Sequence, residues 1–386
     1  MTGRSASDLV RKAAKVADEV AGPAADDVDR QARFPREAVD ALRGEGLLSA
    51  LVPAELGGGD DDLQAVSEAV TALARHCAST AMVFAMHQIQ VACMARHRGH
   101  QLLDDYMAEI SAEQRLLASA TTEINIGGDV RSSSCAVERD GERFTLAKTA
   151  TVISYGEYAD AVLTTARRDP EAPPSDQVLV LCRADEVTLE PISGWDTLGF
   201  RGTCSLGFKL TAAGDVGCIL PDSFGDISAQ TMLPVSHILW ASVWLGLAQE
   251  AEARARKFVQ KEARKNPSHP PPSALRLAEL TAVLQQMTQL VRAASRQFDE
   301  QADDREALAS IGFAISMNAL KVAAADLVVD VVNRAIVICG MAGYREDSPF
   351  SLGRILRDAH GAQVMINNDR INANNAQMLL VHRGSE

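Results

Sequence analysis

The 386-residue sequence predicts a mainly helical protein with a central β domain. A chain of this length is too long for one ordinary hydrophobic core, so two or three packed units are expected. Alanine and leucine dominate a composition that is 47% hydrophobic and 4% aromatic, which favours helix over sheet. After about residue 117, however, short β-rich runs separated by turns replace the helical pattern. We therefore predict a helical domain at 1–117, a β domain at 118–222 and a helical bundle at 223–386.

The first region has the pattern of helices joined by short loops. Residues 8–21 are amphipathic, and a second helix opens at residues 34–37. The run Pro-Ala-Glu-Leu-Gly-Gly-Gly at 53–59 breaks the pattern, and helix resumes after Asp62. Residues 78–95 are apolar nearly all round, which predicts a buried helix.

The middle region carries strand signals. Residues 137–144 are Val-Glu-Arg-Asp-Gly-Glu-Arg-Phe, and the Asp-Gly pair favours a hairpin with a type I′ turn. Residues 161–166 and 178–182 are short apolar runs, and the proline-bearing stretch 169–175 between them predicts a loop. Regular short strands separated by turns predict a small β-barrel or sandwich.

The last region returns to helical periodicity. Apolar residues recur there with 3-4-3-4 spacing, which predicts a stripe facing a partner helix. The stripe consists of Leu277, Leu280, Leu284, Met287 and Val291. Prolines at 267 and 270–272 predict the loop that precedes this helix, and residues 311–338, apolar on most faces, are expected at the centre of a bundle.

Charge and cysteine usage narrow the function classes. The formal net charge of −13 argues against nucleic acid or an anionic membrane as the principal partner. The N-terminus lacks a signal-peptide pattern, and charges interrupt the long apolar helices, so we expect a cytoplasmic protein without membrane insertion. The seven cysteines are dispersed and the eight histidines form no ligand cluster, which predicts buried free thiols and no metal site.

Two segments carry the clearest chemical signal. Residues 120–129, Ala-Thr-Thr-Glu-Ile-Asn-Ile-Gly-Gly-Asp, and residues 152–156, Val-Ile-Ser-Tyr-Gly, combine hydroxyls, a carboxylate and glycines. Glycine leaves the backbone unshielded, so donors and hydroxyls can approach a flat heteroaromatic ring and its carbonyls. The order and spacing of the two segments predict a flavin enzyme. The candidate cofactor residues here are Thr122, Glu123, Gly127, Gly128, Ile153 and Ser154.

These segments belong to a set of six motifs that resembles the acyl-CoA dehydrogenase family over essentially the whole chain. The other four are residues 53–58, the turn 198–203 around Arg201, the glycine turn 339–344 with Gly340 and Gly343, and the Arg-Asp segment 354–359. The resemblance implies an N-terminal helical domain, a β-barrel and a C-terminal four-helix bundle. It also implies FAD held by Arg201, Gly340 and Gly343 besides the residues above, with Ser154 near flavin N5. A homotetramer or homodimer is implied as well, because family members complete the FAD site across a subunit interface.

The resemblance further implies α,β-dehydrogenation of an acyl thioester on CoA or a carrier protein, with an electron-transfer flavoprotein or O2 as acceptor. That reaction needs a carboxylate to remove the α-proton while the β-hydride goes to the flavin. The family supplies a glutamate after the Arg-Asp segment or at the start of the first bundle helix. Here residues 364–371 and 234–238 contain none, and Asp369 is the one acid near either place. Asp369 is therefore the provisional base.

The missing glutamate keeps other interpretations open. Some flavin monooxygenases resemble this fold and use reduced flavin and O2, and His87 or His237 would then serve as acid, base or hydrogen-bond partner near the substrate. Each histidine is equally compatible with a core position. Basic residues over 254–265 suit either a phosphate of FAD or CoA from a neighbouring subunit or a solvated face. A third interpretation is a catalytically silent flavoprotein or helical scaffold.

Overall fold

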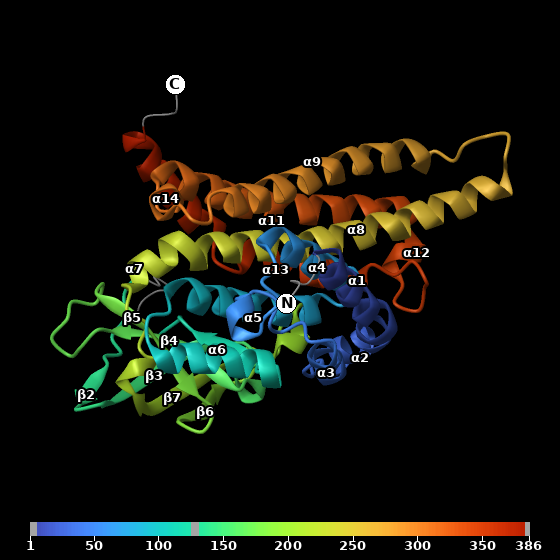
Figure 1. Cartoon of the computed structure of the whole chain (residues 1–386). Helices are drawn as coiled ribbons and strands as arrows, with labels where there is room; N and C mark the ends of the chain where they lie inside the picture. Colours follow the sequence, from blue (N-terminus) through green and yellow to red (C-terminus); the bar gives the residue numbers. More distant parts are fainter. Residues whose placement is uncertain (1–5, 125–130, 383–386) are drawn as a thin grey trace.

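The computed structural model describes residues 6–124 and 131–382. The first part of the chain is helical. The α-helices are α1 Ala6–Val16, α2 Gly22–Gln31, α3 Arg36–Gly44, α4 Leu63–Ala74, α5 Ala78–His97 and α6 Gln101–Glu113. Of these, α4 and α5 lie between the β region and the long C-terminal helices (Figure 1). A π-helical turn, η1 Ala17–Ala21, joins α1 to α2, and η2 Ala54–Leu56 is a 3-10 turn.

Local chemistry explains where these helices begin. The Asp62 side chain accepts a hydrogen bond from Ala65 N–H and caps α4 where the sequence predicted helix to resume. In the preceding loop a Cβ on Gly58 would lie 2.0 Å from Val52 O, so the close backbone approach there requires glycine. Helix α5 is buried on nearly all faces, which confirms the prediction for residues 78–95.

The strands form two sheets. They are β1 Leu117–Ala120, β2 Glu138–Asp140, β3 Arg143–Ile153, β4 Ala161–Arg167, β5 Gln177–Arg183, β6 Val187–Ser193 and β7 Leu206–Asp215. One sheet has the order β1-β4-β5, with β1 parallel to β4, and the other has the order β2-β3-β7-β6. The short turns η3 Gly156–Tyr158, η4 Arg201–Thr203 and η5 Val216–Cys218 follow strands or precede them. The predicted central β domain is thus present, as two packed sheets.

The hairpin is present, but its turn differs from the predicted one. Asp140 pairs with Arg143, so the two-residue loop is Gly141-Glu142, one residue later than the Asp-Gly pair. Gly141 has φ +59°, whereas Glu142 is not among the residues with positive φ. A positive φ at the first loop position alone is the pattern of a type II′ turn, which favours glycine at that position. The type I′ prediction is therefore wrong.

The C-terminal helices form a bundle along one side of the molecule (Figure 1). They are α7 Phe224–Ile227, the π-helical η6 Ser228–Met232, α8 Leu233–Lys265, α9 Ser273–Glu300, α10 Arg305–Leu308, α11 Ile311–Cys339, α12 Met341–Tyr344, α13 Gly353–Val364 and α14 Asn368–Val381. Helices α8, α9 and α11 pack on one another, and the ends of α8 and α9 project as an arm (Figure 1). Leu280, Leu284, Met287 and Val291 are buried, as their spacing predicted.

Helix α8 also joins the bundle to the N-terminal helices. Ser242 Oγ lies 2.7 Å from Ser67 Oγ of α4, and a Cβ on Gly246 would lie 2.5 Å from Thr71 O. The stretch Phe224–Lys265 is long and apolar enough to cross a membrane, but 89% of its apolar window is buried inside the protein, as in a core helix. The element type changes between α6 and β1 and between η5 and α7, while the exact domain limits at 117 and 222 stay a prediction.

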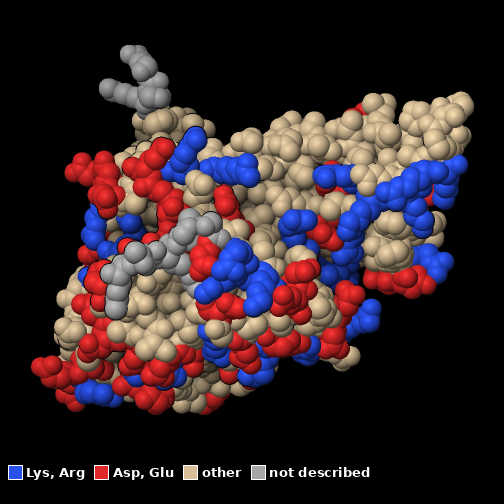
Figure 2. Space-filling view, turned by 45° about the vertical axis from the view of Figure 1, so that its right-hand side comes forward, with Lys and Arg blue, Asp and Glu red and all other residues tan. Residues whose placement is uncertain are grey.

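The remaining predictions from composition concern cysteines, metal sites and charge. All seven cysteines are buried and free. Residues 6–124 and 131–382 contain no group of three or more potential metal ligands. Figure 2 shows Lys and Arg gathered along the projecting arm, which carries Arg256, Lys257, Lys261, Arg264 and Lys265. Arg256 and Lys265 pair with glutamates of their own helix.

Candidate active site at the edge of the β domain

Three of the seven non-glycine residues with positive φ in the described part of the chain lie just after β3 and in the loop between β6 and β7. Tyr155, Phe200 and Cys204 all have positive φ, between 43° and 50°. Such conformations are costly for bulky residues and cluster at functional sites. Tyr155 N–H donates to Thr203 O at 2.8 Å, which joins the two segments. The structure therefore brings the predicted 152–156 and 198–203 motifs together.

Ser154 lies at this junction with its side chain almost fully buried. Its Oγ accepts a hydrogen bond from Ser205 Oγ at 2.8 Å, and Ser205 Oγ lies 2.8 Å from Thr203 Oγ1. No other described residue bonds to the Ser154 hydroxyl, so its own hydrogen is available to a bound molecule. Neighbouring Ile153 is buried and pairs with Leu206, and its cofactor contact stays a prediction.

Thr122 belongs to the same cluster. Its Oγ1 donates to Val152 O at 3.1 Å and accepts from Val152 N–H at 3.3 Å. This reciprocal pair holds residues 121–124 beside the end of β3, where the sheet register shifts between Ala150 and Ile153. Thr122 and Ser154 are thus two predicted cofactor residues that the fold places at one edge. The predicted Gly127 and Gly128 lie outside the described residues.

Glu123 is turned away from this edge. Its carboxylate accepts hydrogen bonds from Ser133 Oγ, Ser134 N–H and Ser134 Oγ, and Lys148 Nζ lies 3.4 Å away. Burial alone would raise the pKa of Glu123, but the serine hydrogen bonds and the Lys148 charge outweigh it and hold the pKa below its usual value. The buried pair anchors residues 131–135 to β3. The carboxylate of Glu123 is thus bound by protein groups, and its cofactor role stays a prediction.

Arg201 is likewise occupied by protein groups. Its Nε donates to Asp29 O at 3.0 Å, and its Nη1 donates to Thr197 O at 2.7 Å and to Asp196. The Asp29 carboxylate in turn accepts two hydrogen bonds from Arg357, at 2.8 and 2.6 Å. Arg201 thus ties the β domain to α2 and, through Asp29, to α13, and its contact with the cofactor stays a prediction.

Phe200 connects the strained turn to α13. Its N–H donates to Asp358 Oδ1 at 2.6 Å, and its ring is packed where a Cβ on Gly361 would lie 2.8 Å away. Its carbonyl accepts from Trp195 Nε1 at 3.0 Å and from Thr203 Oγ1 at 2.9 Å. Burial raises the pKa of Asp358 to about 6. The sequence identified both motifs but gave no signal for this contact between them.

His87 is a core histidine. Its side chain is fully buried, Nε2 lies 2.7 Å from Leu48 O, and Nδ1 accepts from Leu117 N–H at 2.9 Å. Burial lowers the pKa of His87 to about 4, so the ring is neutral near pH 7. Because backbone groups bind both nitrogens, His87 has the contacts of a core histidine, and its catalytic role stays a prediction.

His237 differs in having one nitrogen without a described partner. Its Nδ1 donates to Met317 O at 3.0 Å, which places the lone pair of the neutral ring on Nε2. Burial lowers the pKa of His237 to about 4, and the Lys321 charge acts in the same direction. The ring lies 6.0 Å from that of Trp240, whose buried Nε1–H has no acceptor among the described residues. A donor and an acceptor are therefore both available on this face of α8.

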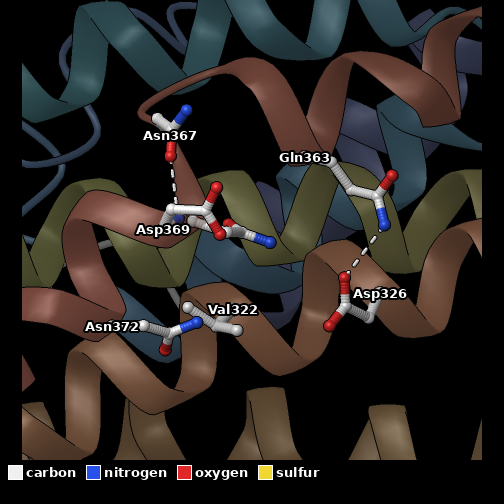
Figure 3. Close-up of a pocket in the computed structure, with 7 residues that line it drawn as sticks. Val322, Asp326, Gln363, Asn367, Asp369 and Asn372 are labelled. Atoms are coloured by element: carbon white, nitrogen blue, oxygen red, sulfur yellow. Dashed lines mark hydrogen bonds between the residues drawn. The ribbon is translucent and has the colours of Figure 1, made fainter. Parts of the chain in front are cut away.

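Asp369 lies on the outer side of the bundle. It occupies the first turn of α14, where Asn367 caps the helix by accepting from Asp369 N–H at 2.8 Å. The exposed carboxylate lines an open cavity of about 320 Å³ with Asp326, Gln363 and Asn372 (Figure 3). Six of the seven lining residues are polar. This is the opposite of the dry pocket that would make a carboxylate a stronger base.

Lys321 fixes the corner between α13 and α14. Its Nζ donates to Ile366 O at 2.6 Å, to Asn368 Oδ1 at 2.7 Å and to Ala362 O at 3.2 Å. Burial lowers the pKa of Lys321 to about 8. At this corner Ile366 has φ +51° although it is β-branched. Nothing in the sequence pattern of α11 distinguished this lysine.

The last predicted cofactor residues are turn glycines. Gly340 has φ +56° between α11 and α12, and a Cβ on Gly343 would lie 2.7 Å from that of Cys339. Their backbone conformation and close packing require glycine whether or not a cofactor is nearby.

Comparisons with known proteins identify the fold and the chemistry that it hosts. Two family models match: "Acyl-CoA dehydrogenase, N-terminal domain" over residues 5–111 and "Acyl-CoA dehydrogenase, C-terminal domain" over residues 225–375. Cyclohex-1-ene-1-carbonyl-CoA dehydrogenase of Geobacter metallireducens is 24% identical over 369 residues, 94% of either chain. Amino sugar nitrososynthase DnmZ of Streptomyces peucetius is 25% identical over 353 residues, 88% of this chain and 84% of its own.

Solved structures agree with the family models. FMN-bound TdsC, a dibenzothiophene monooxygenase of Paenibacillus sp. A11-2, superposes with a TM-score of 0.84 at 19% identity, covering 97% of this chain and 98% of its own. Butyryl-CoA dehydrogenase of Megasphaera elsdenii gives a TM-score of 0.80 at 21% identity, covering 98% and 99%. Dehydrogenases of this family are oxidoreductases that act on CH–CH groups. This chain therefore belongs to the acyl-CoA dehydrogenase family of flavoproteins.

Proposed function

We propose that this protein is a flavin-dependent monooxygenase built on the acyl-CoA dehydrogenase fold. The proposal rests on the partners and the solvent exposure of the carboxylates. Dehydrogenation of an acyl thioester needs a carboxylate whose basicity is raised by a dry pocket and which has no cationic partner. Among the described residues, the buried Asp29, Glu123 and Glu252 have cationic partners, and Asp369 is exposed in a polar cavity. Burial raises the pKa of Asp358 to about 6, but its carboxylate accepts from Phe200 N–H and so maintains the contact between the β domain and α13.

The engagement of the buried carboxylates is specific in each case. Asp29 binds Arg357, Glu123 binds Lys148 and two serines, and Glu252 binds Arg256 and Thr281. Asp358 accepts from Phe200 N–H, and Asp61 also has a partner. Removing any of these carboxylates from its partner would leave a buried charge or donor unpaired, at a cost of about 1–3 kcal/mol or more. These groups are suited to holding the domains together.

A monooxygenase needs instead an oriented group that can exchange a proton or hydrogen bond with its substrate. We propose His237 for this role in place of His87. Met317 O holds its Nδ1–H and thereby orients the ring, and Nε2 carries the lone pair. The neighbouring Trp240 Nε1–H offers a donor on the same face of α8.

The residues at the β-domain edge suit a flavin. The Ser154 hydroxyl has a hydrogen that no described residue accepts, and Thr122 holds the adjoining loop against β3. When bound, the flavin would supply hydride acceptance and, once reduced, reaction with O2. We propose FAD, for which Lys257 and Arg264 on the projecting arm offer charges to a phosphate. Extraction and mass spectrometry distinguish FAD from FMN.

Relatives support this proposal without deciding the substrate. The nitrososynthase DnmZ and the dibenzothiophene monooxygenase TdsC are members or structural neighbours of this family. We also propose a homotetramer or homodimer. Val337, Met341 and Tyr344 near the end of α11, and Leu380 on α14, are large apolar side chains exposed on the bundle. Light scattering of the purified protein measures the subunit number.

A second candidate is α,β-dehydrogenation of an acyl thioester on CoA or a carrier protein, with an electron-transfer flavoprotein or O2 as acceptor. The family models and the CoA-ester dehydrogenases among the relatives favour it. In this candidate function, Asp369 is the proposed base among the described residues. Anaerobic mixing of the flavin-loaded protein with a panel of acyl-CoA thioesters tests it. Bleaching of the visible flavin band supports dehydrogenation, and an unchanged band after addition of butyryl-CoA and longer esters supports the monooxygenase.

A further inference from the structure

Three buried hydroxyls form a chain that leads from the β-domain edge into the protein. Ser205 Oγ donates to Ser154 Oγ, Thr203 Oγ1 donates to Phe200 O, and the contact between Ser205 and Thr203 is 2.8 Å. The side chains of all three are nearly inaccessible. Each hydroxyl holds one hydrogen. With the outer links in these directions, the middle contact has no hydrogen left.

Rotating the hydroxyls resolves this conflict in either of two ways. In the outward direction, Thr203 donates to Ser205, Ser205 donates to Ser154, and Ser154 donates to a bound molecule. In the inward direction, Ser154 accepts from the bound molecule and donates to Ser205, which donates to Thr203, which donates to Phe200 O. Hydroxyl rotation is the only movement that either direction requires.

The protein end of the chain tolerates both directions. Phe200 O also accepts from Trp195 Nε1 at 3.0 Å and from Thr203 N–H at 3.1 Å. A carbonyl has two lone pairs, so these two donors satisfy it when the Thr203 hydroxyl turns away. Neither direction therefore leaves the Phe200 carbonyl without a donor.

We infer that Ser154, Ser205 and Thr203 form a reversible hydrogen-bond relay that lets Ser154 follow the oxidation state of the bound flavin. The inference rests on the proposed cofactor and on Ser154 lying beside flavin N5. Oxidised N5 accepts a hydrogen bond. Two-electron reduction by a hydride donor places that hydride on N5, which then becomes an N–H donor. The outward direction serves the oxidised flavin, and the inward direction serves the reduced one.

Interrupting the relay disfavours one oxidation state. In Thr203→Val the outward direction keeps all its donors paired, whereas the inward direction leaves the Ser205 hydrogen without an acceptor. In Ser205→Ala the inward direction leaves the Ser154 hydrogen without one. Buried donors without a partner are costly. Both changes should therefore favour oxidised over reduced flavin, while Thr203→Ser keeps the hydroxyl and serves as the matched control.

The experiment is the two-electron midpoint potential of the flavin-loaded protein, measured by equilibrium with a reference dye. Thr203→Val and Ser205→Ala should each change the ratio of reduced to oxidised flavin about tenfold toward oxidised, which lowers the potential by about 30 mV. Thr203→Ser should keep the wild-type potential, and thermal unfolding of the flavin-free variants should confirm that all three fold.

Each outcome decides the inference. Equal potentials in flavin-loaded wild type, Thr203→Val and Ser205→Ala would overturn the relay and leave the flavin assignment intact. A lowered potential in Thr203→Ser would also overturn it, since the hydroxyl would then not be the cause. Failure of the wild-type protein to bind any flavin would overturn both the relay and the proposed function. Bleaching by an acyl thioester would overturn only the monooxygenase proposal.

Discussion

The burial of His87 makes a quantitative prediction about acid stability. An unfolded histidine has a pKa near 6.5, whereas burial lowers the pKa of His87 to about 4 in the folded protein. Between these values the unfolded chain binds a proton that the folded chain does not. The folded state is therefore favoured above pH 6.5 and loses that advantage as the pH falls toward 4. At about 1.4 kcal/mol per pH unit, the loss amounts to about 3 kcal/mol.

The matched variant is His87→Gln. Glutamine supplies one donor for Leu48 O and one acceptor for Leu117 N–H, as the neutral imidazole does, but it does not titrate. Urea unfolding of the two proteins should give similar free energies at pH 7.5. At pH 4 the variant should be more stable than wild type by about 3 kcal/mol. His237 titrates in both proteins and cancels from the difference.

Two results would contradict the prediction that His87 is a neutral core histidine. An identical pH dependence of the two unfolding free energies would mean that His87 is not held neutral by burial. A variant that keeps its flavin and stability but loses turnover at pH 7.5 would mean that His87 acts on the substrate after all.

Three further predictions concern the surface acid, the buried lysine and the interdomain pair. Asp369→Asn should leave flavin binding and flavin reduction unchanged in absorbance assays, because the carboxylate is exposed; an abolished reduction would restore it as the base. Lys321→Met should lower the unfolding free energy by about 2–4 kcal/mol and speed hydrogen exchange at the α13–α14 corner, because the Ala362 and Ile366 carbonyls and Asn368 Oδ1 lose their donor. Unchanged exchange there would contradict this prediction. Asp29→Asn should lower the urea unfolding free energy by about 1–3 kcal/mol through the loss of the Arg357 pair, whereas Asp26→Asn, at an exposed carboxylate, should cost about 1 kcal/mol or less. Equal costs would contradict the role of the Asp29–Arg357 pair in joining α2 to α13.

The fold was accessible from sequence because it follows from local patterns. The 3-4-3-4 stripe from residue 280 to 291 is buried, and α5 is apolar on all faces because it is surrounded. The hairpin was predicted but its turn was misplaced. Asp140 and Gly141 both suit a turn, and the choice between them depends on which strand register buries Phe144 and Leu146.

The site was predictable at the level of backbone segments. Residues 121–124, 152–156 and 198–203 do meet at one edge, because hydroxyls and glycines mark where strands end. Side-chain partners were not predictable. Glu123 and Arg201 both appeared suited to a cofactor, yet their partners, Lys148 and Asp29, are distant in the sequence and come close only in the fold.

Lys321 and Asp358 were not predicted for the same reason, because their partners are distant in the sequence. Lys321 acts through carbonyls 41 and 45 residues away, and Asp358 acts through Phe200 N–H. Neither contact leaves a local pattern, because the acceptor or donor is a backbone group that any residue type provides. The same limit separated His87 from His237, since each is a lone histidine on an apolar helix until its nitrogens are assigned partners.

The proposed monooxygenase function is best tested by the reaction of the reduced protein with O2. The flavin-loaded protein is reduced anaerobically with dithionite, mixed with oxygenated buffer in a stopped-flow instrument and followed across the flavin absorbance range. A monooxygenase should give two phases, with a transient spectrum that differs from those of oxidised and reduced flavin and that decays faster when His237 is replaced by glutamine. The contrary result is reoxidation in a single phase without a transient, in a protein whose flavin is bleached by acyl-CoA thioesters. That result would contradict the monooxygenase function and establish a dehydrogenase.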